Sequence, residues 1–462
     1  MMAKLYRFLT RPPEPRSLTR TTPAIKRWHD RQSWGTKASM DVSYPIRPVD
    51  DAELPAFGQV ADHAFNSNVP PAKMLEFDRL VIEPERTLVA FDGDRAVGTT
   101  LAFSFGLTVP GGDIVGAAGI SGVGVLPTHR RRGVLSSLMR RQLADIAAGS
   151  EPVAALFASE SAIYGRYGYG SAADQYSFTF NRGDGRLRPL SDVASNPAST
   201  PAPMLRLAEP KSAAAEMKAV YEAVRPTRPG MLTRHDGWWD GSVSDPEFLR
   251  EGNSPLRCVI AEDQAGPRGY ALYAAKPDWG RDGMPAQVLS VRELFWTDPA
   301  SAVALWADLL SRDLVIEVRT RMRPADDPIQ HLLADPRRTR TRVSDGLWIR
   351  IVSLPEALMR RRYSCPVDTV IEVADPQLTA NEGRWRLTAG GRADGENPSC
   401  ERTTASADVT LPMSALGAAY LGGARLGGLA AAGQITEHRP GALTELSAAM
   451  WWDPAPWSPM MF

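Results

Sequence analysis

Over residues 41–185 the apolar positions follow two periods, one typical of strands and one typical of helices. The stretch YPIRPVDDAELPAFGQVADHAF predicts a short strand and then a helix, because its apolar residues fall on one helical stripe: Leu54, Phe57, Val60, Ala61, Ala64 and Phe65. TLVAFDGDRAVGTTLAFSF predicts two strands joined at Asp92–Gly93, a hairpin signal because glycine tolerates positive φ. ISGVGVLP predicts a third strand.

A second helix is expected directly after this strand. Arg140, Arg141 and Asp145 lie off its apolar stripe, which consists of Leu135, Leu138, Met139, Leu143, Ile146 and Ala147. The resulting order of strand, helix, hairpin, strand, helix and strand predicts an α/β fold of the mixed-sheet (α+β) kind.

The same pattern returns further along the chain. CVIAEDQAGPRGYALYA repeats the hairpin, and SVRELFWTDPASAVALWADLL repeats the strand, proline and helix. Gly98 and Gly269 are separated by almost the same number of residues as Pro127 and Pro299, which predicts a duplicated domain. The second copy has TDPASA where the first has PTHRRRG, so it lacks any function that the arginines carry.

A third region begins near Leu347. VDTVIEVADPQLTANEGRWRLTAGG predicts two strands, and ADVTLPMSALGAAYLGGARLGGLAAAG predicts a strand followed by helices of small residues. The tryptophans and prolines of MWWDPAPWSPMMF predict an ordered tail. The basic stretch 1–40 is either a disordered extension or sequence ahead of a start at Met40. The expected domains are therefore residues 41–185, 186–345 and 346–462.

Composition narrows the class of protein. A formal net charge of zero argues against a nucleic-acid binder or a membrane-surface binder held by bulk charge. Three cysteines at distant positions, Cys258, Cys365 and Cys400, form neither a disulfide framework nor a metal site, and they suit a reducing cytoplasm. No apolar run reaches the roughly 18 residues that span a bilayer.

Chemistry concentrates in VGVLPTHRRRGVLSSLMRR, residues 123–141. The first turn of a helix offers free backbone N–H groups and partial positive charge, Gly133 permits close approach, and Arg130–Arg132 supply guanidinium donors. These features suit a pyrophosphate. Val123 and Val125 share one face of the strand and Gly124 leaves room on the other, so an extended ligand can pair with the strand edge. The alternatives are a solvated charged turn and a nucleic-acid patch.

The pattern V-x-V-x-P-x-x-R-R-R-G resembles the acetyl-coenzyme A motif of the GNAT N-acetyltransferases. ASESAIYGRYGYGSA (158–172), the duplication and the aromatic end narrow the resemblance to the actinobacterial Eis (enhanced intracellular survival) family. That resemblance implies tandem GNAT-like domains, only the first with acetyl-CoA, and a sterol-carrier-protein-like C-terminal domain. It also implies a homohexamer that acetylates primary amines of polyamines, aminoglycoside-like acceptors or lysine side chains.

Specific roles follow from the resemblance. Tyr164 matches the general acid, and Phe462 matches the residue whose α-carboxylate is the base. The coenzyme contacts carry over to Val123, Gly124, Val125, Arg131, Arg132, Gly133, Val134, Leu135, Ser136, Ser159 and Glu160. A phenol with a pKa of about 10 is a weaker acid than a thiol at about 8.5, so Tyr164 is better described as a positioned donor. An α-carboxylate, with a pKa of about 3.5, needs burial or a water relay to act as a base.

Other assignments stay open in the sequence. Tyr167 and Tyr169 compete with Tyr164, and Phe462 can be an aromatic plug. Asn66 and Ser67 stand where the family often has an acidic residue, and Met461 precedes the terminal phenylalanine, so the acceptor is not fixed. Trp238 and Trp239 either line a pocket or belong to the core. The alternative function is a lipid or sterol carrier with structural acetyltransferase domains, favoured by LGAAYLGGARLGGLAAAG.

Overall fold

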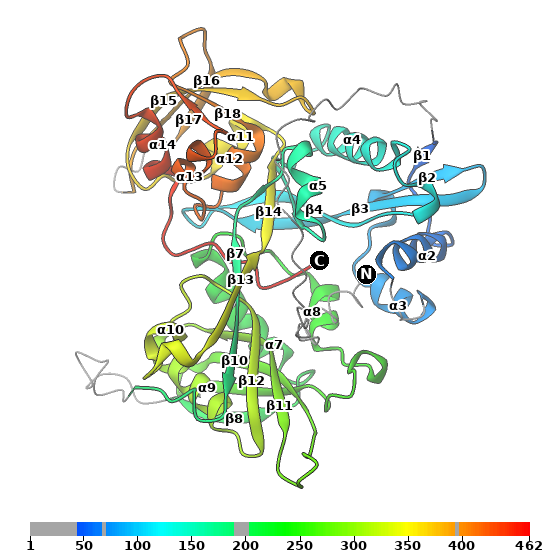
Figure 1. Cartoon of the computed structure of the whole chain (residues 1–462), viewed down its shortest axis with the longest axis vertical. Helices are drawn as coiled ribbons and strands as arrows, with labels where there is room; N and C mark the ends of the chain where they lie inside the picture. Colours follow the sequence, from blue (N-terminus) through cyan, green and yellow to red (C-terminus); the bar gives the residue numbers. More distant parts are fainter. Residues whose placement is uncertain (1–43, 67–70, 189–202, 393–396) are drawn as a thin grey trace, which may run out of the picture.

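The computed structural model of the chain describes residues 44–66, 71–188, 203–392 and 397–462. The basic stretch expected over 1–40, and Ser67, lie outside the described residues. These described residues form three sheets, two with seven strands and one with five, and helices cover each sheet (Figure 1). None of the helices in the described ranges is long and apolar enough to cross a membrane.

The first sheet carries the arginine motif. Its strand order is β1 (Ile46–Arg47), β2 (Thr87–Asp92), β3 (Arg95–Thr108), β4 (Ile114–Val125), β5 (Val153–Phe157), β14 (Leu347–Ile351) and β6 (Gly170–Ser171). The β2–β3 hairpin turns at Gly93, whose φ is 58°, as predicted. Its helices are α2 (Leu54–Phe65), α3 (Pro71–Asp78), α4 (Val134–Ala147) and α5 (Ser161–Tyr164).

The two long helices of the first sheet bury most of the predicted stripes. The buried residues of α2 are Leu54, Phe57, Val60 and Ala61, and those of α4 include Leu138, Met139, Leu143 and Ile146. Ala147 is exposed instead of buried. Gln142 takes an inward position because the Thr100 hydroxyl donates a hydrogen bond of 3.0 Å to its side-chain oxygen.

The second sheet repeats the strand order of the first. Its strands are β8 (Met204–Ala208), β9 (Arg257–Asp263), β10 (Gly266–Lys276), β11 (Gln287–Trp296), β12 (Val315–Arg323), β7 (Asp174–Asn181) and β13 (Arg340–Asp345). Its main helices are α7 (Ala214–Val224), α8 (Asp236–Val243), α9 (Pro299–Ser311) and α10 (Ile329–Leu332). The predicted duplication is confirmed.

Equivalent glycines show how closely the two copies match. Gly98 pairs with Val125, and Gly269 pairs with Trp296, at the same place in each sheet. A Cβ on Gly98 would lie 2.6 Å from Val134 of α4, and one on Gly269 would lie 2.9 Å from Leu305 of α9. Both glycines therefore let a helix pack closely on the sheet.

The two prolines used in the sequence comparison are not equivalent. Pro127 opens a 3-10 turn (Pro127–His129) ahead of the arginines, whereas Pro299 is the first residue of α9. The connection between strand and helix is shorter in the second copy, so the two prolines occupy different positions although the duplication that their spacing predicted is confirmed.

The two sheets exchange one strand each. β7 follows the first sheet along the chain but lies in the second, and β14 follows the second sheet but lies in the first (Figure 1). The two crossings run side by side, because Gly346 N–H donates to Ala173 O and Ala172 N–H donates to Leu347 O, both at 2.9 Å. The domain predicted over 41–185 thus contributes β7 to the second sheet, and the one predicted over 346–462 contributes β14 to the first. A hydrophobic pattern predicts a strand but does not specify which strand pairs with it.

The third sheet has the order β17 (Ser399–Arg402), β16 (Gly383–Ala389), β15 (Val367–Ala374), β18 (Val409–Pro412) and β19 (Thr436–Glu437). Its helices are α11 (Leu354–Arg360), α12 (Met413–Ala419), α13 (Leu426–Ala431) and α14 (Ala442–Met450). α12 packs tightly on the first sheet, because a Cβ on Gly417 would lie 2.3 Å from Ile349 O. The first and third sheets consequently share one hydrophobic core.

The tail, residues 451–462, contacts the domain of each of the three sheets. Trp452 N–H donates to Gly422 O in the third, and Ala455 N–H donates to the Asp326 carboxylate in the second. Phe462 ends the chain against the first sheet, at the C mark of Figure 1. The predicted ordered tail is confirmed, with Trp452, Trp457, Met460 and Phe462 buried.

Candidate active site

A β-bulge opens the first sheet beside the arginine motif. Thr99 pairs with Gly124 but Leu101 pairs with Ser121, so β4 has one more residue than β3 between these pairs. Gly122 has a φ of 60°, and its carbonyl accepts a 2.8 Å hydrogen bond from the Thr99 hydroxyl. Bulges of this kind bend a strand.

The bend separates β4 from its parallel neighbour. The β4–β5 ladder covers Ala117–Ile120 and Val153–Leu156 and ends there. Residues 121–125 of β4 thus have no ladder partner on the β5 side, and we call this gap the first opening. A strand edge of this kind can bind an extended ligand through main-chain hydrogen bonds.

The predicted alternation at the first opening is confirmed, with one difference. Val123 and Val125 pack partly against the residues under α4. A Cβ on Gly124 would lie 2.9 Å from the Ala64 Cβ of α2. The room at Gly124 is therefore filled by α2 and serves helix packing.

The arginine turn has an unusual backbone. Arg131 has a φ of 62° and Gly133 a φ of 85°, so two residues of the turn are left-handed. His129, buried just before them, is held by Thr128 at 2.8 Å and by Asp92 at 3.1 Å. Left-handed residues in a short turn direct successive N–H groups to one side and form an anion-binding concavity.

The turn is also open to a ligand. Gly133 is the N-cap of α4 and supplies no side chain to its first N–H groups, and a Cβ there would meet nothing within 4 Å. Arg130–Arg132 are exposed and form no ion pair with a described residue. In the second copy Asp298 caps α9, accepting from Ser301 N–H at 2.9 Å. Only the first copy therefore keeps this helix N-terminus free for an external anion.

The remaining predicted coenzyme contacts surround the first opening in different ways. The Val134 side chain is buried beneath α4, so only its backbone can face a ligand. Leu135 is half-buried, and the Ser136 hydroxyl shares a 3.1 Å hydrogen bond with Tyr167. Ser159 and Glu160 lie two and three residues after the end of β5, on the far side of the first opening from β4.

The three tyrosines of IYGRYGYG have different environments. The Tyr167 hydroxyl forms a hydrogen bond with Ser136, and the Tyr169 hydroxyl is fully buried with no hydrogen-bond partner among the described residues. Tyr164, at the end of α5, is the remaining phenol, neither bonded to a described side chain nor fully enclosed. Burial, with smaller contributions from Glu160 and Tyr167, raises the pKa of Tyr164 to about 12. The phenol therefore stays protonated and able to donate.

The glycines between these tyrosines have structural reasons. Gly168 has a φ of 84°, and a Cβ there would lie 2.8 Å from the Arg350 Nε of β14. A Cβ on Gly170 would lie 2.0 Å from Ser414 O of α12. Arg350 in turn forms a buried ion pair of 2.7 Å with Asp375 of the third sheet's domain. The segment is thus clamped between β14 and the third sheet's domain.

Phe462 lies in an aromatic seat formed by Phe103, Phe105, Phe157 and Trp238. Its ring centroid is 5.0 Å from that of Phe105, 5.4 Å from Phe157 and 6.3 Å from Phe103. Trp238 of α8 packs on Phe103 at 5.1 Å and on Phe105 at 5.5 Å. Phe462 is 5% exposed. The ring is an anchor that fixes where the terminal backbone lies.

The sequence analysis missed the aromatic seat. Its members come from β3, β5 and α8, which are far apart in the chain. The sequence showed only that these residues are aromatic and gave no sign that they meet. Both tryptophans are buried: Trp238, 3% exposed, belongs to the core cluster of the first sheet, and Trp239 belongs to the core of the second sheet, 5.5 Å from Tyr221. The core interpretation therefore holds for both residues.

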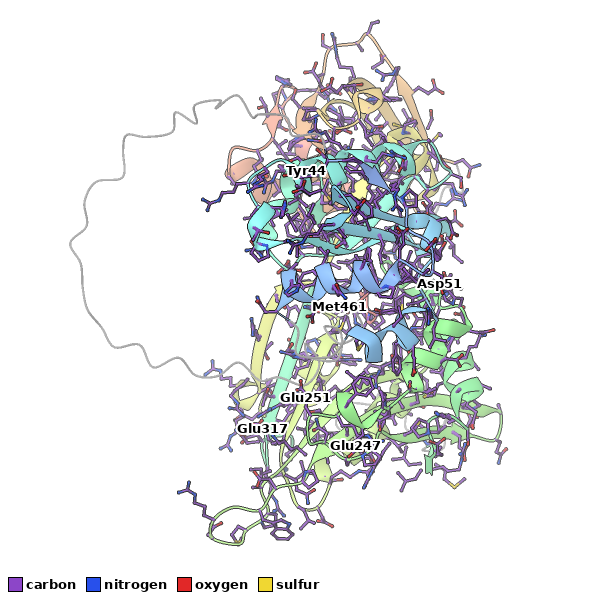
Figure 2. All side chains as sticks on the ribbon, turned by 90° about the vertical axis from the view of Figure 1, so that its right-hand side faces the viewer. Tyr44, Asp51, Glu247, Glu251, Glu317 and Met461 are labelled. Atoms are coloured by element: carbon purple, nitrogen blue, oxygen red, sulfur yellow. The ribbon has the colours of Figure 1, made fainter. Side chains whose placement is uncertain are left out.

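Tyr164 and Phe462 flank the first opening from opposite faces of the sheet. Tyr164 packs in the cluster with Ala154, Leu156 and the residues of α4. Phe462 packs in the other cluster, with Ala155 and the residues of the seat. In Figure 2, Met461 lies near the level of α2, where the first sheet faces the second.

Comparisons with known proteins agree with this geometry. Residues 45–172 and 230–351 match models of the acetyltransferase (GNAT) domain, and residues 354–459 match the sterol carrier protein domain. An uncharacterized N-acetyltransferase of Streptomyces avermitilis is 44% identical over 412 residues, 89% of this chain and 96% of that protein. The N-acetyltransferase Eis of Mycobacterium tuberculosis is 33% identical over 410 residues, 87% of this chain and 95% of that protein.

The chain belongs to the Eis family. The crystal structure of Eis1 from Mycobacterium abscessus has a TM-score of 0.75 at 30% identity and covers 90% of this chain and 100% of its own. The predicted fold, tandem GNAT domains followed by a sterol-carrier-like domain, is confirmed. As an Eis-family protein, the chain is an acyltransferase of the N-acetyltransferase type. The described residues include no group of three or more histidine, cysteine or acidic side chains placed to hold a metal ion.

The aromatic seat can be tested through Gly119 of β4. A Cβ there would lie 2.4 Å from the Phe105 ring and 3.0 Å from the Phe462 ring. We expect Gly119→Ala to lower the free energy of unfolding by about 1–3 kcal/mol, the usual cost of overpacking. Gly116→Ala, on the same strand with its nearest contact at 3.4 Å, should change it by less than about 0.5 kcal/mol. Equal losses in urea unfolding would contradict the packing of Phe462 described above.

Proposed function

We propose that this Eis-family chain transfers the acetyl group of acetyl-CoA to a primary amine at the first opening. The observation that carries the proposal is the contrast between the copies: only the first keeps both an uncapped, arginine-lined helix start and an unpaired strand edge. A pyrophosphate suits the turn at Arg131–Ser136, and the amides of a pantetheine arm suit the backbone of Val123–Val125. Ser159 and Glu160 supply the facing wall.

The chemistry divides between two groups of the chain. The amine nitrogen attacks the thioester carbonyl carbon, and its proton passes, through a water relay, to the α-carboxylate of Phe462. The C–S bond then breaks with its electron pair on sulfur. Tyr164 donates a hydrogen bond to the developing thiolate and keeps its proton, so CoA leaves as the thiolate, whose charge is balanced by the proton that the amine released. Because the pKa of Tyr164 lies near 12, this donation stabilises charge more than it transfers a free proton.

Acceptors for this reaction are primary amines of polyamines, aminoglycoside-like compounds or lysine side chains. Release of free CoA from acetyl-CoA, measured across a panel of these amines, tests the function and identifies the acceptor. A thermal shift with acetyl-CoA but not with sterols or fatty acids supports the transferase over the lipid-carrier alternative. The opposite pattern of shifts would contradict the proposal. We also propose a cytoplasmic homohexamer, which sedimentation velocity on the full chain can test.

The coenzyme turn gives the first functional prediction. Gly133→Val should weaken acetyl-CoA binding about tenfold to a hundredfold, the range for a lost charge-assisted hydrogen bond, because a side chain would occupy the anion's path. Calorimetric titration measures the affinity. Gly183→Val is a matched control, since Gly183 has the same φ of 85° and is equally open, so both variants carry the same backbone strain. The control should bind acetyl-CoA normally.

The second functional prediction concerns the positive charge of the arginine turn. Replacing Arg131 and Arg132 together by alanine should weaken binding and flatten its dependence on salt. Replacing Arg337 and Arg338, two exposed arginines near the second sheet, removes the same charge elsewhere. This change should leave the acetyl-CoA affinity and its dependence on salt unchanged. Identical effects of the two pairs would show that bulk charge alone attracts the coenzyme.

Tyr164→Phe should lower turnover by about two to four orders of magnitude, the range for a lost general acid, while acetyl-CoA affinity stays the same. Since the folded-state pKa is raised to about 12, the donor form persists through the alkaline range. A rate loss caused by Tyr164 ionisation should therefore appear only as the pH approaches 12. Tyr169→Phe is the control, because the Tyr169 hydroxyl forms no hydrogen bond within the described part of the chain. A larger loss in that control than in Tyr164→Phe would reassign the donor.

The terminal carboxylate gives the last prediction on the chemistry. Residues appended after Phe462 convert its carboxylate to an amide, so turnover should collapse while acetyl-CoA affinity and melting temperature stay nearly constant. Phe462→Leu keeps a carboxylate and an apolar anchor and should retain far more activity. Deleting Phe462 withdraws the carboxylate by up to about 3.6 Å, beyond hydrogen-bond reach. Steady-state rates of these variants, all carrying an N-terminal tag, test the prediction. Full activity in the extended chain would show that Phe462 serves only in packing.

A further inference from the structure

The second sheet has an opening at the same place as the first. Leu272 pairs with Glu293 but Tyr273 pairs with Val291, so β11 has a bulge where β4 has one. Its parallel ladder with β12 ends at Val291 and Thr320. Residues 292–296 of β11 are thus the counterpart of residues 121–125, and we call this gap the second opening.

A side chain closes the second opening. Arg323, at the end of β12, donates through Nη1 to Leu294 O of β11 at 2.6 Å and through Nε to Asp327 at 2.6 Å. Leu294 lies two residues before Trp296, as Val123 lies two residues before Val125, so its carbonyl is the counterpart of a proposed coenzyme contact. Arg323 is 3% exposed. No described side chain donates to the matching Val123 carbonyl in the first sheet, whereas in the second sheet the Leu294 carbonyl accepts a hydrogen bond from Arg323.

Trp457 of the tail also packs in the second opening, beside Arg323. Its ring lies 5.0 Å from Phe295 and 4.9 Å from the Arg323 guanidinium, and its indole N–H donates to Met322 O. Its backbone N–H donates to Pro229 O at 2.8 Å. A Cβ on Gly230 would lie 3.0 Å from Trp457 O, so a glycine is needed where the tail passes. With 4% of its surface exposed, Trp457 is enclosed on all these sides.

We propose that the second opening is an anchor for the tail, and that Trp457 and Arg323 are positioning residues that hold Phe462 at the first opening. The proposal rests on the proposed role of the Phe462 carboxylate. Chain ends fray unless they are tied down, and the ordering of each residue costs conformational entropy. Trp457 fixes the tail five residues before its end, within about 18 Å of extended chain. Anchor and aromatic seat together hold the segment between them.

The test compares Trp457→Ala with Trp457→Phe in chains that end at Phe462. Trp457→Ala should lower kcat about tenfold to a hundredfold, the effect of misplacing a catalytic group by about 1 Å, with the acetyl-CoA Kd within twofold. Trp457→Phe keeps the ring on Phe295 and Arg323 and loses one hydrogen bond, so about a threefold loss is expected. Trp279→Ala, an exposed tryptophan of the second sheet's domain, is the matched control and should change nothing.

A second readout reports on the tail without relying on activity. A carboxypeptidase that prefers terminal aromatic residues should release Phe462 at least about tenfold faster from Trp457→Ala than from the wild type, as measured by intact mass. Unchanged release and unchanged kcat in Trp457→Ala would overturn the proposal. Faster release with unchanged kcat would also overturn it as a positioning device. If the wild type itself transfers no acetyl group, the proposed function fails, and the release rates still decide whether the anchor exists.

Discussion

The bulge at Gly122 is the constraint on which the active-site arrangement depends. It turns β4 away from β5 after Ile120, so a strand in the middle of a sheet acquires a free edge. Everything proposed for catalysis lies around that edge: the arginine turn at one end, Tyr164 on one face and the Phe462 seat on the other. Without the bulge, β4 and β5 would continue their ladder and no ligand could enter. A positive φ of 60° makes glycine the favoured residue at this point.

Strand exchange explains why the site cannot be assembled by the first domain alone. β14 enters the first sheet from beyond the second, and it brings Arg350, which packs beneath Gly168 and pairs with Asp375. The Tyr164 segment therefore rests on a strand and an ion pair that lie far away in the sequence. Removing one partner of a buried pair leaves an uncompensated charge, so this contact ties the position of Tyr164 to the third sheet's domain.

The sequence could predict what depends on local pattern and on motifs. The β2–β3 hairpin, the stripes of α2 and α4, the duplication and the arginine turn all follow from spacing or turn chemistry within a few residues. The aromatic seat, the strand exchange and the closing of the second opening depend on side chains from distant segments. Gly168 and Gly170 illustrate the difference: their motif is visible in the sequence, but its reason is contact with Arg350 and Ser414. Gly124 illustrates the reverse, since its predicted ligand space is occupied by Ala64.

The two openings show two solutions to one physical problem. A free strand edge leaves backbone groups that need partners, and burying them unsatisfied costs free energy. In the second sheet, Arg323 donates a hydrogen bond to Leu294 O, and the tail packs over the second opening. In the first sheet, no described side chain takes this position at the matching edge, and the N-cap residue Gly133 has no side chain to cap α4. A duplicated fold that fills one edge with its own residues can use that copy for rigidity. It can then leave the other edge to an external ligand, which is the division of roles expected when only one copy performs chemistry.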